Sequence, residues 1–204
     1  MTKIDINKEN NHVLMIKFIS STEIELEKVI NELDKFVFSF LDILEKETAY
    51  VIISGYLPIL FGRPRSTDDI DILIPKMTGV QFQKLHNELV SNNFWFINSE
   101  NIDDLFDLLS SNESIRIAID QEVTPNVELK FIKDPKDQET FKNKLTVIFA
   151  NKKLFISPLE LQIAYKEMML KSPKDLEDAL HLRELFKEQI NENKIIQYKQ
   201  KWQI

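Results

Sequence analysis

Residues 50–75 constrain the fold of this chain more than any other stretch, because strand and turn signals follow one another closely there. The β-branched run from Tyr50 to Ile53 predicts a buried strand, and Ser54-Gly55 predicts a tight turn at its end. The apolar residues from Tyr56 to Phe61 predict one or two helical turns, which end at Gly62. We therefore expect a strand, a turn and a short helix in direct succession.

A second strand is predicted from Asp69 to Ile74, and its first residues have the chemistry of a metal site. Side chains two apart on a strand point to the same face, so Asp69 and Asp71 should project together. Two carboxylates so close repel each other unless a cation lies between them. Mg²⁺, or Mn²⁺ in its place, fits because magnesium is usually held by one or two carboxylates together with substrate phosphates.

Groups that could bind those phosphates flank the short helix. Ser54 and the backbone amide of Gly55 stand at its head, where the helix dipole favours an anion. Arg63 and Arg65 follow the helix, and their guanidinium groups could neutralise phosphate charge. The stretch thus predicts a site for a metal ion and phosphate.

These signals form one ordered motif: a small-Gly turn, a Gly-x-x-Arg loop and a Thr-x-Asp-x-Asp strand, represented by Ser54, Gly55, Gly62, Arg65, Thr67, Asp69 and Asp71. The motif resembles that of the nucleotidyltransferase superfamily. Within it, the chain resembles the small prokaryotic branch that includes the abortive-infection toxin-type (AbiEii-like) nucleotidyltransferases. Two positions depart from the pattern, since Ser54 stands where a first glycine is common and Leu57 where a small residue is common.

A second match to the same family lies far along the chain and in the expected order, at Ser157, Pro158, Leu161, Lys166, Lys174, Asp175 and Asp178. The resemblance implies that Lys166 contacts a phosphate and that Asp175 positions this lysine. The alternative is that Lys166 is an ordinary solvent-facing lysine of a helix.

Nucleotidyl transfer of this kind generally needs a third carboxylate beside the first two. Glu128 is the first candidate, because it stands between apolar neighbours in a predicted strand, as the family's third acidic residue does. Asp120, at the end of the preceding strand, is the second candidate. Alternatively, Glu128 is an exposed strand residue paired with a lysine. Lys130, on the same face as Glu128, could be a salt-bridge partner or a phosphate contact.

Helices and strands alternate along the rest of the chain. Thr22 and Glu25 form a possible capping box for a long amphipathic helix that extends to Leu44. Proline or asparagine signals predict helix starts at Ser157, Ser172 and Asn191. Further helices are predicted over 78–90 and 101–109, strands over 94–97, 114–120, 126–132, 145–149 and 154–156, and a charged connector over 133–144.

We therefore predict an α/β (α+β) fold with a nucleotidyltransferase-type mixed sheet flanked by helices. The core would comprise residues 1–156 and a small C-terminal helical region residues 157–204. A chain of 204 residues is long enough to bury a sizeable core.

Net charge, cysteine content and the length of apolar runs limit the kinds of partner that the protein can have. The net charge of −7 does not indicate a nucleic-acid-binding surface over the whole molecule, although a local basic face is compatible with it. The chain has no cysteine, which excludes disulfides and thiolate metal sites. No signal-peptide pattern and no apolar run of membrane-spanning length is present, so we expect a cytoplasmic protein without a membrane partner.

The resemblance implies a Mg²⁺-dependent transfer of a nucleoside monophosphate from a nucleoside triphosphate to an acceptor hydroxyl. Its toxin-type members further imply an RNA end, such as that of tRNA, as acceptor and an antitoxin protein as partner. A binding or regulatory module that has kept the fold and lost the reaction is the alternative. The phenylalanine-rich first helix could also make a homodimer contact.

Overall fold

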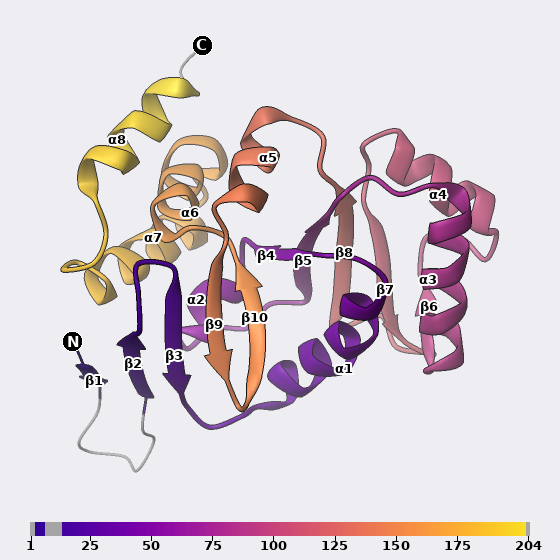
Figure 1. Cartoon of the computed structure of the whole chain (residues 1–204), viewed down its shortest axis with the longest axis horizontal. Helices are drawn as coiled ribbons and strands as arrows, with labels where there is room; N and C mark the ends of the chain where they lie inside the picture. Colours follow the sequence, from indigo (N-terminus) through magenta and orange to yellow (C-terminus); the bar gives the residue numbers. More distant parts are fainter. Residues whose placement is uncertain (1–2, 7–13, 203–204) are drawn as a thin grey trace. The chain divides into compact units, whose positions relative to one another are not determined.

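The computed structural model describes residues 3–6 and 14–202 (Figure 1), with side chains from residue 14 onward. Its contacts divide the chain into two compact units. The first unit contains residues 1–29, 57–65 and 142–204, and the second contains residues 30–56 and 66–141. The predicted division of the chain at residue 156 stays a prediction.

The second unit contains a mixed sheet. The strand order is β4 (Val51–Ile53), β5 (Asp69–Ile74), β8 (Asn126–Phe131), β7 (Ile115–Ile119) and β6 (Phe94–Phe96). Strands β5 and β8 run parallel, and the other neighbouring pairs, including the β7–β8 hairpin, are antiparallel.

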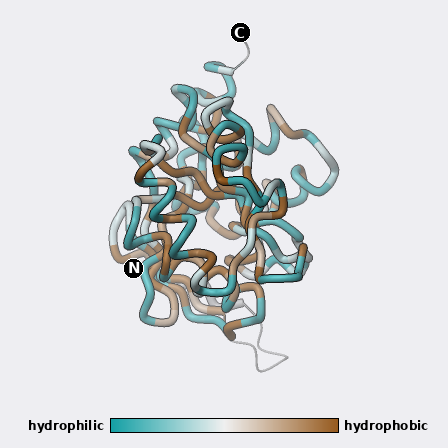
Figure 2. The backbone as a smooth tube through the Cα atoms, turned by 90° about the vertical axis from the view of Figure 1, so that its right-hand side faces the viewer, coloured by the Kyte–Doolittle hydropathy of each residue, from teal (hydrophilic) through white to brown (hydrophobic). Residues whose placement is uncertain are grey.

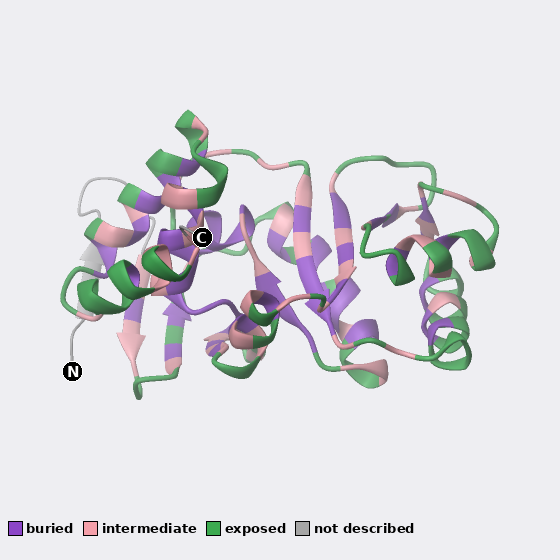
Figure 3. Ribbon diagram, turned by 90° about the horizontal axis from the view of Figure 1, so that it is seen from above, coloured by how far each residue is buried: buried purple, intermediate pink, exposed green. Residues whose placement is uncertain are grey.

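Aromatic side chains pack helices against one face of this sheet. The ring of Phe94 in β6 lies 6.2 Å from that of Phe36 and 5.5 Å from that of Phe40, while Phe106 meets Phe131 of β8. Hydrophobic and hydrophilic residues alternate along the helical turns of the chain in Figure 2, and Figure 3 shows helices with buried residues on one side and exposed residues on the other. The helices are α1 (Glu32–Glu47), α3 (Gly79–Ser91) and α4 (Ile102–Ser110). A further helix, α5 (Pro135–Lys142), lies in the second unit except for its last residue.

Side chains along β5 alternate between the hydrophobic core on one face of the sheet and the predicted metal site on the other. Ile70, Ile72 and Ile74 are fully buried, and Ile74 is in register with Phe131, which faces the helices. Asp69 and Asp71 therefore project from the opposite face of the sheet.

The first unit combines a second mixed set of strands with the C-terminal helices. The strand order is β1 (Lys3–Ile6), β2 (Leu14–Phe18), β3 (Glu23–Glu27), β9 (Leu145–Phe149) and β10 (Lys152–Ile156). Strands β3 and β9 run parallel, and the other neighbouring pairs are antiparallel. The helices are α2 (Tyr56–Leu60), whose first residue belongs to the second unit, α6 (Leu159–Tyr165), the π-helix η1 (Lys166–Leu170), α7 (Pro173–Leu185) and α8 (Glu192–Lys201).

The predicted start of the first helix is wrong. Glu23–Glu27 forms strand β3, and helix α1 begins at Glu32 with Asn31 as its cap. Ile24 and Leu26 are buried while Glu25 and Glu27 are exposed, which is the alternation of a strand. Thr22 and Glu25 therefore do not form a capping box.

Two further predictions need correction, and two are confirmed. The predicted connector over residues 133–144 contains helix α5. Helix α6 has no side-chain cap, so Ser157 does not act as one. In contrast, Ser172 caps α7 with a proline at the first helical position, and Asn191 caps α8. Within the described residues, no helix has both the length and the apolar character needed to cross a bilayer.

Candidate active site

The turn after β4 has an unusual backbone. Ser54 adopts a φ of 63°, in the left-handed region where glycine is favoured. The resemblance places a glycine at this position, and this conformation gives the physical reason. Helix α2, which follows, has only five residues, so its dipole is small. Phosphate binding by Ser54 and Gly55 stays a prediction that rests on the turn.

One row of residues crosses four neighbouring strands of the second unit. Asp71 of β5 is in register with Ile53 of β4 on one side and with Glu128 of β8 on the other. Glu128 is in turn in register with Arg116 of β7. Because Ser54 follows Ile53 directly, the turn, the second aspartate and Glu128 lie along the same line across the sheet.

Asp69 stands at the start of β5, next to the loop that carries Thr67. The Thr67 hydroxyl lies 3.1 Å from Oδ1 of Asp69 and 3.1 Å from its backbone carbonyl oxygen, and can donate to them. Asn126 of β8 is the register partner of Asp69, and its side chain donates to the backbone oxygen of Asp68. These contacts hold the N-terminal end of β5 in place.

A lysine joins two of the predicted site carboxylates. The ammonium of Lys130 lies 2.5 Å from Oδ1 of Asp71 and 3.0 Å from Oε2 of Glu128. Arg116 donates from Nε and Nη2 to Oε1 of Glu128 at 3.0 and 2.9 Å. Glu128 is therefore a half-buried carboxylate with two cationic partners. The expectation that it is an exposed strand residue is wrong, but the expected pairing with a lysine is confirmed.

Burial and charge change the pKa values of these groups. Burial raises the pKa of Asp71, Lys130 offsets part of this rise, and the neighbouring charges of Glu128 and Asp69 add to it. Burial would also raise the pKa of Glu128, but hydrogen bonds from Lys130 and Arg116 outweigh it and lower that pKa. Burial disfavours the charged form of Lys130, but Asp71 and Glu128 raise its pKa overall.

The chemistry of these side chains suits a divalent ion. Asp69, Asp71 and Glu128 supply oxygen ligands, which Mg²⁺ and Mn²⁺ prefer. The Lys130 ammonium already occupies a cation position between two of them. In the part of the chain that the structure describes, no three carboxylate or histidine side chains converge into a ready-made ion site. A metal ion could use this donor set after Lys130 moves.

The remaining predicted binding residues lie in the first unit, within a cluster of ion pairs around Asp178 of α7. Arg63 and Arg65 pair with this carboxylate, and Arg63 also pairs with Glu177. Lys166 lies 2.8 Å from Asp178 and 3.0 Å from Asp175. Burial would raise the pKa of Asp175, but hydrogen bonds from Ser172 and Lys166 lower it.

Lys166 is fully buried, so the reading of it as a solvent-facing helix lysine is wrong. It opens the π-helix η1, a type of turn that is rare and often found at functional sites. The position of Asp175 beside Lys166 agrees with the positioning role that the resemblance implies. Contacts of Arg65, Lys166 and Asp175 with a nucleotide stay predictions.

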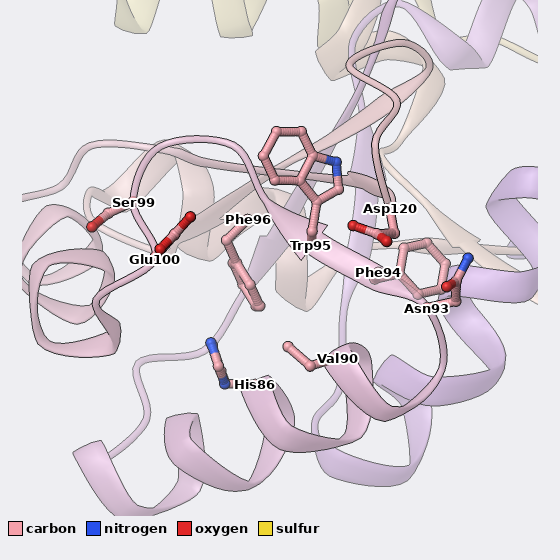
Figure 4. Close-up of a pocket in the computed structure, with 9 residues that line it drawn as sticks. All are labelled: His86, Val90, Asn93, Phe94, Trp95, Phe96, Ser99, Glu100 and Asp120. Atoms are coloured by element: carbon pink, nitrogen blue, oxygen red, sulfur yellow. The ribbon is translucent and has the colours of Figure 1, made fainter.

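Asp120, the second candidate for the third carboxylate, lines a pocket of about 440 Å³ beside strand β6 (Figure 4). His86 and Val90 of α3 form one side of this pocket, and Trp95 and Glu100 contribute to another. Asp120 follows β7, which is separated from β5 by β8. The geometry therefore favours Glu128, whose strand directly neighbours that of Asp71.

The sequence predictions missed the importance of two residues. Asp178 was noted only as part of a motif, yet it is the carboxylate on which three cations converge. The available signal was its helical spacing from Leu182 and Leu185, which lie on the buried side of α7. Arg116 lies within the strand predicted over residues 114–120, but its pairing with Glu128 follows only from the register between β7 and β8.

The fold is of the nucleotidyltransferase type, as the sequence resemblance implied. The chain is similar to the solution structure of the antibiotic-resistance factor ANT(2'')-Ia, which has substrate-regulated conformation dynamics. The TM-score is 0.52 with 13% sequence identity, over 82% of this chain and 89% of that chain.

A second similar structure is that of an antigenic nucleotidyltransferase-like protein from Paracoccidioides brasiliensis. Its TM-score is 0.49 with 15% identity, over 82% of this chain and 87% of that chain. No protein-family model and no curated protein sequence matches the chain.

Proposed function

We propose that this protein is a nucleotidyltransferase that moves a nucleoside monophosphate from a nucleoside triphosphate to an acceptor hydroxyl. The observation that carries the proposal is the register of Asp71 with Glu128 on parallel strands, in a fold of the nucleotidyltransferase type. Asp69 projects from the same face two residues earlier, and the turn at Ser54 follows the strand on the other side of β5.

In the proposed reaction the acceptor hydroxyl loses its proton with the help of Glu128, and its oxygen forms a bond to the α-phosphorus while the bond to pyrophosphate breaks. Asp69, Asp71 and Glu128 would hold a divalent ion, whose chemistry is to stabilise the charge that develops on the attacking and leaving oxygens. The turn at Ser54 and Gly55 binds phosphate through its backbone amides. The protein's contribution is to position the two substrates and to provide compensating charge.

The first test is calorimetric titration with each of the four nucleoside triphosphates, with and without Mg²⁺, followed by transfer of a labelled nucleotide. Replacing Asp69 and Asp71 by Asn should abolish metal-dependent binding and transfer while leaving the fold intact. The matched control is Asp68→Asn, which removes an adjacent exposed carboxylate and should retain both properties. Full transfer by the Asp69→Asn, Asp71→Asn variant would contradict the proposal.

The family resemblance motivates an RNA end as the acceptor to test first, with an antitoxin as the partner of the same system. An acidic chain would need a local basic face to hold RNA, so binding should weaken steeply as salt rises. RNA affinity that does not change with salt would contradict an RNA acceptor. Small hydroxylated molecules would then be the next acceptors to test.

One observation favours a second function, a nucleotide-binding or regulatory module without turnover. Lys130 and Arg116 already neutralise Glu128, and Lys130 also neutralises Asp71. If these ion pairs are permanent, the protein binds nucleotide without turnover or does not bind it at all, and no label is transferred. Transfer of the labelled nucleotide would exclude this function.

A further inference from the structure

Two cations face the three predicted site carboxylates on one side of the second unit's sheet. Lys130 pairs with Asp71 and Glu128, and Arg116 pairs with Glu128 only. The carboxylates bring three negative charges and these two partners bring two positive charges. Lys130 contributes the charge that touches two carboxylates at once, so it competes directly with any metal ion there.

We propose that Lys130 is an exchangeable counter-ion that keeps free metal out and admits it together with the nucleotide. Without substrate, its ammonium neutralises Asp71 and Glu128. When a metal-bound triphosphate arrives, Asp71 and Glu128 would bind the metal ion and Lys130 would pair with a phosphate oxygen instead. This inference rests on the proposed function, because it requires the carboxylates to bind a metal ion.

The side chains around Lys130 are suited to such an exchange. The Lys130 side chain is 32% exposed, so its ammonium can turn toward a ligand on the open side of the sheet. A lysine ammonium is a compact charge on a flexible side chain, and it can donate hydrogen bonds in several directions. Arg116 binds Glu128 through two nitrogens and would hold that carboxylate in place while Lys130 moves.

Exchange of this kind makes the binding of metal and nucleotide mutually dependent. A free metal ion must displace an ammonium without receiving phosphate ligands in return. A metal ion that binds with the nucleotide gains phosphate oxygens, and the displaced ammonium gains a new anionic partner. Reciprocal coupling between two ligands typically changes each affinity by roughly 5- to 150-fold.

The test is a titration of the nucleotide-free protein with Mn²⁺. Binding is measured by calorimetry and, independently, by the electron paramagnetic resonance signal of the Mn²⁺ that remains free. The variant Lys130→Met should bind Mn²⁺ at least about tenfold more tightly than the wild type. The matched control Lys133→Met removes an exposed lysine three residues later and should leave the affinity unchanged. The variant Lys130→Arg keeps the charge and should bind free Mn²⁺ as weakly as the wild type.

A second titration uses a non-hydrolysable triphosphate analogue. The wild type should bind Mn²⁺ about tenfold or more tightly when the analogue is present, and Lys130→Met should lose most of this increase. The wild-type comparison needs no variant, so it remains informative if Lys130→Met does not fold. Equal Mn²⁺ affinity with and without the analogue, or equal affinity of Lys130→Met and wild type, would overturn the inference.

The failure of this inference can be told apart from failure of the proposed function. If wild type and Lys130→Met both bind Mn²⁺ through Asp69 and Asp71 with equal affinity, only the exchange is wrong. If neither protein binds Mn²⁺, with or without the analogue, the carboxylates are not a metal site and both proposals are wrong.

Discussion

Ionisation of Asp71 costs the folded protein free energy. Burial raises its pKa above the unfolded value, and the charges of Glu128 and Asp69 add to a rise that Lys130 only partly offsets. The native state therefore holds the proton more tightly than the unfolded chain. The cost is fully present above the folded pKa and is absent below the unfolded one.

We predict that Asp71→Asn is more stable to urea than the wild type at pH 8. The difference should shrink as the pH falls through the raised pKa of Asp71, because protonation then removes the same charge. Urea unfolding at a series of pH values measures this. A variant that is less stable at pH 8 would mean that pairing with Lys130 outweighs burial.

The left-handed conformation of Ser54 gives a second prediction. Ser54→Gly should be more stable than Ser54→Ala by about 1 kcal/mol, because alanine keeps the Cβ atom that disfavours this conformation. Thermal unfolding of both variants and the wild type provides the comparison. If glycine and alanine give equal stability, the backbone at Ser54 is not strained.

Helix α1 is connected to the turn of the site through one buried contact. Asn31 and Asp34 form a reciprocal capping box at the start of the helix. The Tyr56 hydroxyl donates to Oδ1 of Asp34 at 2.7 Å, and burial followed by the Asp34 charge raises the pKa of Tyr56. The residue after Gly55 is thus tied to the N-terminus of α1.

Replacing Tyr56 by Phe should lower the free energy of unfolding by about 2 kcal/mol, since a buried hydrogen bond to a charged group is lost. The ring itself stays, so its packing is unchanged. Chemical denaturation measures the loss. No change in stability would show that Asp34 is satisfied by its capping bonds alone.

The ion-pair cluster around Asp178 should be essential for the C-terminal helices. Asp178→Asn should cost about 3–5 kcal/mol, because it leaves the fully buried Lys166 and two arginines without their shared carboxylate. Glu177→Gln is the control, since Glu177 is 67% exposed and its pair should contribute less than about 1 kcal/mol. Equal losses in both variants, measured by urea unfolding, would contradict this account.

Local sequence patterns predicted the helices and strands that carry the site residues better than they predicted the surrounding elements. The Asp-Ile-Asp alternation was sufficient for strand β5, and Ser172 followed by proline was sufficient for α7. Strand β3 was misread as helix because Leu26 also fits the helical spacing of Val29 and Ile30, which follow it. The burial of Lys166 had no signal in its own sequence, since its partners lie on another helix.

For the molecule as a whole, the net charge of −7 opposes the approach of an anionic nucleotide. We predict that the association rate of a nucleoside triphosphate rises as ionic strength is increased from about 0.01 M to about 0.15 M, where the Debye length falls to about 8 Å. Stopped-flow fluorescence with a labelled nucleotide measures this rate. A rate that falls with salt would indicate a local positive field strong enough to dominate.

The arrangement of the chain into two units could not be predicted from local patterns. Each unit gathers segments that are far apart in the sequence, so that residues 57–65 belong with the C-terminal helices rather than with the strand before them. Such grouping depends on contacts between distant segments. The predicted fold class nevertheless holds, because it follows from the types of the elements and their order.

The row of residues in register that contains Asp71 and Glu128 also affects how the protein could acquire specificity for a new acceptor. Both carboxylates are carried by hydrogen-bonded strands, and β5 has a strand on each side. Loops generally accept insertions and exchanges more readily than paired strands do. Exchanging loops away from this row should thus alter the choice of acceptor while the reacting groups stay in place, which makes the protein a suitable scaffold for directed evolution.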